Sequence, residues 1–111
     1  MLTDAELLER IKALVEMGSF RLRQPAARHV VEVGFTEGNI VEAVLGESRI
    51  LEDYLFESRC LILSHFQISR NTRTPLHLVI EYLHENAADI MTAYIPQKPW
   101  WVTPWRRGTK K

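Results

Sequence analysis

Two polar side chains, His77 and Tyr94, have the types and spacing that best suit chemistry in this sequence. Apolar and polar residues alternate along a predicted strand that begins at Pro75, so His77 faces away from the apolar positions of that strand. Those apolar positions are Leu76, Leu78, Ile80 and Tyr82. The helices are expected to cover the apolar set, which would leave His77 on the open face of the sheet.

The next predicted strand brings Tyr94 beside His77. If the hairpin between them turns about Glu85 and Asn86, His77 pairs directly with Tyr94. The same register pairs Leu78 with Ala93 and Ile80 with Met91. An imidazole and a phenol would then lie about 5 Å apart at Cβ, close enough to act together as an acid–base pair. The alternative is an ordinary cross-strand pair on a solvated sheet.

Three arginines could hold a phosphate near this pair. Arg59 begins another predicted strand and joins His77 and Tyr94 as a candidate catalytic residue. Arg70 and Arg73 lie in a polar segment between strands, from which they could contact nucleic acid. Two arginines in a polar hairpin loop are also often merely solvated.

The C-terminal arm, residues 97–111, interleaves aromatic and basic side chains. Trp105, Arg106 and Arg107 could stack on nucleobases and neutralise phosphates. The three tryptophans in residues 100–105 are also too apolar to be left in water. The arm could therefore dock on its own sheet or reach across to a second copy of the chain.

Other chemistries find little support. His65, His77 and His84 lack zinc-ligand spacing, and Cys60 is the only cysteine, so neither a metal nor a disulfide is expected. The sequence also has no glycine-rich phosphate loop or nucleophile elbow. No cofactor is expected, and metal-free acid–base chemistry remains if the chain is an enzyme.

Helical signals come first along the chain. Thr3 to Glu6 has capping-box spacing before a helix at residues 4–17, and a short strand at 19–23 precedes a helix at 25–33. Thr36 can cap a further helix that Gly46 ends.

Strand-like runs fill the second half. They span residues 49–55, 59–66, 75–83 and 89–95. We therefore expect an α+β fold whose N-terminal helices pack on one face of a four- to five-stranded, mainly antiparallel sheet. One domain covers residues 1–111, with the helix at 4–17, an α+β core at 19–96 and the arm at 97–111.

The charges cancel overall but are unevenly distributed. Residues 31–60 hold seven acidic and two basic residues, whereas residues 61–111 hold seven basic and three acidic ones. This asymmetry suits an anionic or charge-segregated partner. No apolar run is long enough to span a membrane, and the N-terminus is unlike a signal peptide, so a cytoplasmic protein is expected.

Several segments follow one another in a characteristic order between Phe20 and Arg107. They are Glu32-Val33-Gly34-Phe35-Thr36, Asn39 to Leu45, Arg49 to Tyr54, Cys60 to Leu63, Pro75 to Val79, Thr92 to Pro96, and Trp105 with Arg106-Arg107. This order resembles the family called domain of unknown function 4258, whose members look like toxins of the RelE/MqsR structural class. One difference is Pro25-Ala26, which stands where the family usually has His-Ala; His29 follows one helical turn later.

The resemblance implies a toxin of a type II toxin–antitoxin system that cleaves messenger RNA without a metal. RNA or the ribosome and an antitoxin protein would be its partners. Two alternatives remain open, a non-catalytic binding or regulatory module and a structural homodimer.

Overall fold

The computed structural model describes residues 3–24, 36–82, 86–96, 101–103 and 106–107. The helix expected at 25–33 lies outside the described residues. Among the described residues, no helix is long and apolar enough to cross a membrane.

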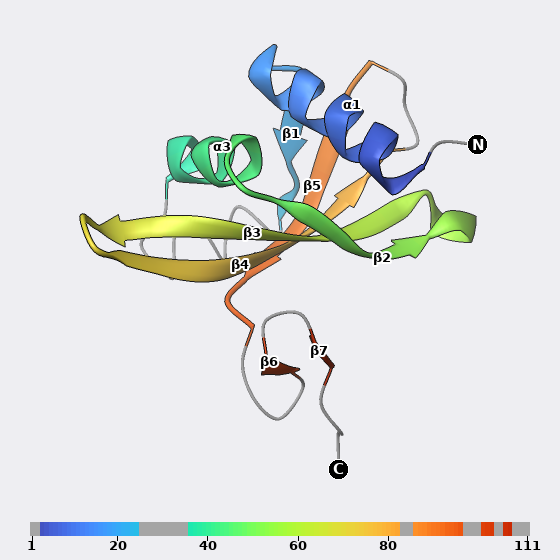
Figure 1. Ribbon diagram of the computed structural model, residues 1–111. Helices are drawn as coiled ribbons and strands as arrows, with labels where there is room; N and C mark the ends of the chain where they lie inside the picture. The colour runs from blue at the N-terminus through green and yellow to red at the C-terminus, as the bar shows by residue number, and fades with distance from the viewer. Residues whose placement is uncertain (1–2, 25–35, 83–85, 97–100, 104–105, 108–111) are drawn as a thin grey trace.

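Over the ranges that the structure describes, two helices pack against a five-stranded mixed sheet, which confirms the expected α+β class (Figure 1). The strands lie in the order β1-β5-β4-β3-β2; β1 runs parallel to β5, and the remaining pairs are antiparallel. The elements are α1 Asp4–Glu16, β1 Phe20–Leu22, α3 Glu37–Leu45, β2 Arg49–Tyr54, a 3-10 helix Leu55–Glu57, β3 Arg59–Ser69, β4 Thr72–Glu81, β5 Ala88–Tyr94, β6 Trp101–Thr103 and β7 Arg106–Arg107.

Both helices begin at the capping residues that the sequence indicates. The Thr3 hydroxyl accepts from the Glu6 backbone N–H, and the Glu6 carboxylate accepts from the Thr3 N–H. The bond from the Thr3 N–H, together with the nearby Thr3 hydroxyl, lowers the pKa of the Glu6 carboxyl group. Thr36 and Asn39 form the equivalent reciprocal pair on α3. Each box satisfies backbone donors that the first helical turn would otherwise leave unpaired.

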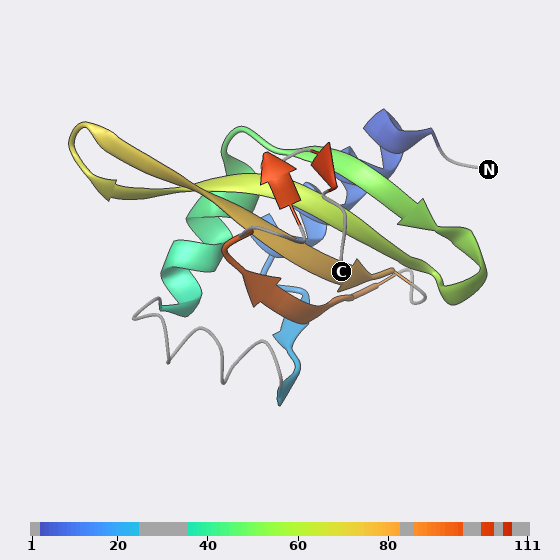
Figure 2. The same cartoon turned by 90° about the horizontal axis from the view of Figure 1, so that it is seen from below.

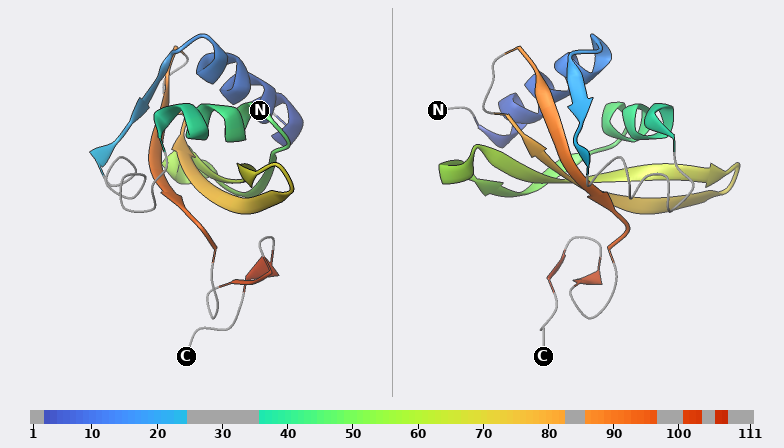
Figure 3. Two further views of the ribbon diagram at one scale, coloured as in Figure 1. Left: turned by 90° about the vertical axis from the view of Figure 1, so that its left-hand side faces the viewer. Right: turned by 180° about the vertical axis from the view of Figure 1, so that it is seen from behind.

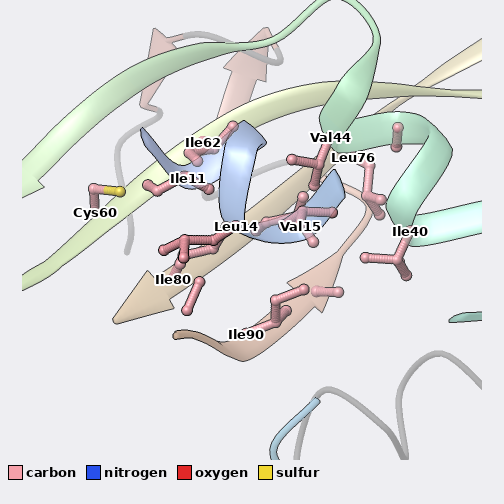
Figure 4. Close-up of a cluster of buried hydrophobic side chains, with 14 of the residues drawn as sticks. Ile11, Leu14, Val15, Ile40, Val44, Cys60, Ile62, Leu76, Ile80 and Ile90 are labelled. Atoms are coloured by element: carbon pink, nitrogen blue, oxygen red, sulfur yellow. The ribbon is translucent and has the colours of Figure 1, made fainter. Parts of the chain in front are cut away.

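One face of the sheet forms the main core with the helices (Figure 4). Leu14 and Val15 of α1 and Val44 of α3 point into the layer between helices and sheet, where Ile80 and Ile90 meet them. The helices therefore cover the apolar set of β4, as expected.

The centre of the opposite face is buried as well, although the alternation pattern predicted an open face at His77. Leu61 and Leu63 are buried although they lie outside the helix-side core. The β6–β7 pair lies on this side of the sheet, away from the helices in Figures 1 and 3 and in front of the sheet in Figure 2, which is seen from below. This second face is thus not a bare solvated surface.

The β4–β5 register is partly as predicted. His77 pairs with Tyr94 and Leu78 with Ala93, but Ile80 pairs with Ile90 and not with Met91. Val79 pairs with Thr92 and Ile80 with Ile90, so β5 has one additional residue, Met91, at this point. This bulge shifts the register by one residue.

The β3–β4 hairpin is longer than predicted. β3 continues to Ser69 and β4 begins at Thr72, so the polar loop expected between the strands shrinks to a turn at Arg70 and Asn71. Gln67 pairs with Arg73 within the ladder. Arg73 is therefore a strand residue, whereas Arg70 stays at the tip.

Candidate functional site

His77 and Tyr94 meet as the sequence predicts. His77 Nδ1 lies 3.2 Å from the Tyr94 hydroxyl oxygen, and the two rings meet edge to face with centroids 5.2 Å apart. The expected solvent position of His77 is wrong, however, because this residue is 0% exposed. Alternation along β4 indicates the face of the sheet on which His77 lies. Its solvent exposure depends instead on whether other residues cover that face.

The pair belongs to one rung that crosses four strands. Arg49 of β2 pairs with Leu63 of β3, Leu63 with His77 of β4, and His77 with Tyr94 of β5. Directly paired residues share a face of the sheet, so all four side chains lie opposite the helices. His65 follows Leu63 by two positions along β3 and shares that face.

A hollow of about 340 Å³ opens at the β2 end of this rung. It is lined by Glu47, Ser48, Arg49, Leu63 and His65. Leu63 thus stands between the buried His77 and this hollow. A ligand there would meet His65 and Arg49, whereas His77 lies one strand further in.

Glu47 is the centre of a charged group at the hollow. Its carboxylate Oε1 lies 3.3 Å from Arg73 Nη2 and 3.8 Å from His65 Nδ1. His65 Nδ1 also lies 3.4 Å from the Glu47 carbonyl oxygen. The His65 side chain is 26% exposed and that of Glu47 is 75% exposed, so both are within reach of a ligand. We call Glu47, His65 and Arg73 the Glu47 cluster.

Arg59 lies away from both groups. Arg59 precedes Leu63 by four positions in β3, which corresponds to about 13 Å along the strand. Its Nε lies 3.1 Å from the Glu81 carboxylate. Across the strands Arg59 pairs with Glu81 and Glu81 with Asp89, and Asp89 binds Arg21 through two bonds of 2.8 and 3.0 Å. The Asp89 carboxylate raises the pKa of Arg21. This row of charges ties β1 to the sheet, and the structure does not bring Arg59 to His77.

The remaining predicted nucleic-acid residues are dispersed. Arg70 is exposed at the hairpin tip, and Arg106 is exposed in β7, the strand that also contains Arg107. Trp105 lies outside the described residues. Of the arginines predicted to hold phosphate, Arg73 is the one that the structure places in the Glu47 cluster.

Within the described part of the chain, no group of three or more His, Cys, Asp or Glu residues could hold a metal ion. Cys60 is buried in the helix-side core, and burial raises the pKa of its thiol to about 12. A thiol so rarely ionised is a poor nucleophile. Acid–base and electrostatic chemistry at the Glu47 cluster is what the described side chains offer.

The sequence reading missed Glu47, Arg49 and His65. His65 was considered only as a zinc ligand, and Glu47 lies in the connection between α3 and β2. The strand pattern could have indicated His65, because position 65 has the same parity along β3 as Leu63. No local sequence pattern places Glu47 beside His65 and Arg73, because these residues follow it by 18 and 26 positions.

No protein-family model, curated protein or solved structure matches this chain. The resemblance drawn from its motifs therefore stays a prediction.

Proposed function

We propose that the chain is a metal-independent endoribonuclease and that its active site is the hollow beside the Glu47 cluster. The observation that carries the proposal is that the Glu47 carboxylate contacts both the His65 imidazole and the Arg73 guanidinium, and that Glu47 and His65 line the open hollow. These are the groups that phosphodiester cleavage without a metal requires, namely a base, an acid and a cation.

The roles follow from the chemistry of RNA. Glu47 accepts the proton of a ribose 2′-hydroxyl, whose oxygen attacks the adjacent phosphorus. The bond from phosphorus to the 5′ oxygen breaks, and protonated His65 donates its proton to that leaving oxygen. The products are a 2′,3′-cyclic phosphate and a 5′-hydroxyl end. Arg73 and Arg49 stabilise the negative charge that grows on the phosphate oxygens in the transition state.

We further propose, in line with the motif resemblance, that the substrate is messenger RNA and that the chain acts as a toxin controlled by an antitoxin protein. Arg70, Arg106 and Arg107 then add electrostatic affinity for the RNA backbone. His77 neighbours Leu63 in the rung and supports the wall of the hollow through it, while Tyr94 contacts His77 from the next strand.

Cleavage of a short single-stranded RNA in the presence of EDTA tests this function. The wild type should produce cyclic-phosphate ends, and an RNA with one deoxyribose should resist cleavage at that nucleotide. Glu47→Gln should lower the single-turnover rate by about 100-fold or more. Glu16→Gln, the same change on the exposed face of α1, is the matched control and should cleave normally. Normal cleavage by Glu47→Gln, or cleavage that EDTA abolishes, contradicts the proposal.

One observation favours a second candidate, a homodimer without catalysis. Phe56 is fully exposed and Leu55 is 52% exposed in the connection between β2 and β3. Adjacent exposed apolar side chains of this size often mark a protein contact. A monomer by light scattering, unchanged by Phe56→Ser, removes this candidate, whereas a dimer that Phe56→Ser dissociates supports it.

A further inference from the structure

A second, smaller hollow lies beside the Glu47 cluster. Its volume is about 180 Å³, and Glu47 and His65 belong to its wall as well as to that of the larger hollow. The other lining residues are Glu42, Ala43, Gly46, Phe66, Gln67 and Arg73. The two hollows therefore meet at the proposed catalytic side chains.

The smaller hollow lies at the edge of the sheet, beyond the end of the β2–β3 pairing, and residues from both faces of β3 line it. Phe66 follows His65 in β3, so its side chain points to the opposite face, toward the C-terminal end of α3. Glu42 and Gly46 come from that end of the helix. An RNA strand that passes from one hollow to the other would thus cross the edge of the sheet at His65.

The lining of this hollow suits a flat, partly polar ring. Phe66 is half-buried and contributes an aromatic ring on the helix side of β3, while Gln67 is exposed on the other face, where its amide can both donate and accept. Its Nε2 already donates to the Arg70 carbonyl at 3.2 Å, which directs the amide along the hairpin. Aromatic surfaces of this kind stack on nucleobases, and amides recognise their edges.

The size of the hollow limits the ligand. Pockets for drug-sized molecules span roughly 300–1,000 Å³, so this one suits a smaller group such as a single base. A base pair would not fit beside Phe66. The occupant must therefore come from a single strand or a loop, the part of RNA whose bases can be unstacked and read.

The carboxylate of Glu42 favours one base. Guanine carries two adjacent donors, its N1–H and its 2-amino group, which one carboxylate can accept together. Adenine and uracil do not present two such donors side by side. Arg73 borders the same hollow and can contact the phosphate attached to the bound nucleotide.

We propose that the Phe66 hollow binds one unpaired nucleobase of single-stranded RNA, with guanine preferred, next to the phosphate that is cleaved. The location next to the cleaved phosphate rests on the proposed function. Binding of the base does not depend on that function and is measured separately. Phe66 supplies the stacking surface and Glu42 the base selectivity.

Fluorescence anisotropy with an uncleavable probe tests the inference. The probe is a short labelled oligouridine that carries one guanosine and a 2′-O-methyl group on every ribose. Phe66→Leu should weaken binding by about tenfold or more, since loss of one base stack has that order of effect. Phe66→Tyr keeps the ring and should bind like the wild type. Phe56→Leu, at an exposed aromatic outside the hollow, is the matched control.

Selectivity is measured with a second probe in which adenosine replaces the guanosine. The wild type should prefer the guanosine probe, and Glu42→Gln should lose that preference while still binding both. If Phe66→Leu retains its thermal unfolding transition and binds the probe as tightly as the wild type, the inference is overturned. Equal affinity of the wild type for both probes overturns the guanine preference.

The two proposals fail differently. Glu47→Gln should stop cleavage and leave probe affinity within a few-fold of the wild type. If Glu47→Gln stops cleavage but Phe66→Leu binds the probe like the wild type, only the base-binding inference is contradicted. Normal cleavage by Glu47→Gln contradicts the proposed function and leaves base binding in place.

Discussion

Two histidines lie on the same face of the sheet, in neighbouring strands, yet their surroundings differ completely. His77 is fully buried and meets the Tyr94 hydroxyl, whereas the side chain of His65 is 26% exposed beside Glu47 and Arg73. Strand alternation identified His77 as the better candidate. The comparison teaches that the face of a residue follows from its sequence position, while access to it depends on what covers that face.

The pairs also differ in what they can do. A buried imidazole that hydrogen-bonds to a half-buried phenol fixes two neighbouring strands and contributes to packing. An accessible imidazole beside a carboxylate and a guanidinium can exchange a proton with a ligand and stabilise its charge. We therefore propose that His77 and Tyr94 have a structural role and that the Glu47 cluster has the chemical one.

The largest expected effect on stability separates the two histidines. His77→Ala leaves a cavity and removes the partner of the Tyr94 hydroxyl, so it should lower the free energy of unfolding by about 2–4 kcal/mol. His65→Ala, at the rim of the hollow, should cost less than about 1 kcal/mol. Urea denaturation of both variants provides the measurement. Equal losses would remove the distinction between a packed and an accessible histidine.

A smaller change tests the hydrogen bond itself. Tyr94→Phe deletes the hydroxyl that lies 3.2 Å from His77 Nδ1 and should cost about 1 kcal/mol of stability. RNA cleavage should stay within a few-fold of the wild type at a temperature where both proteins are folded. A large loss of cleavage without a loss of stability would return the catalytic role to Tyr94.

Arg73 should show the opposite pattern. Its ion pair with Glu47 is exposed, so Arg73→Gln should change the free energy of unfolding by less than about 1 kcal/mol. Cleavage should nevertheless fall, because the variant loses a cation beside the reacting phosphate. Arg23→Gln, at an exposed arginine just after β1, is the control for the loss of one positive charge. Equal cleavage by both variants would contradict the role of Arg73.

The smallest effect concerns the helix-side core. Burial raises the pKa of the Cys60 thiol to about 12, so the thiol stays protonated and shielded near neutral pH. Iodoacetamide should therefore label Cys60 slowly in the folded protein and quickly in urea. Mass spectrometry of the labelled protein measures both rates. Rapid labelling of the folded protein would show that this core opens easily.

Much of the fold follows from local signals. Thr3 and Thr36 start helices because their hydroxyls satisfy backbone donors, and alternation places Leu78 and His77 on opposite faces. The shift between Val79 and Ile80 was not predictable, since a bulge changes the register without changing the polarity pattern.

The candidate site was only partly predictable for a related reason. The contact of His77 with Tyr94 follows from the pairing of two adjacent strands. The Glu47 cluster instead depends on how the connection after α3 passes the β3–β4 hairpin, and that hairpin is longer than its polar residues suggested. Long-range packing of this kind leaves no periodic signal in the sequence.

The most direct test of the central claim compares single-turnover RNA cleavage by His65→Gln and His77→Gln, each assayed where circular dichroism shows it to be folded. The account predicts that His65→Gln lowers the rate by about 100-fold or more, while His77→Gln cleaves within a few-fold of the wild type. The reverse order, with His77→Gln inactive and His65→Gln active, would contradict it.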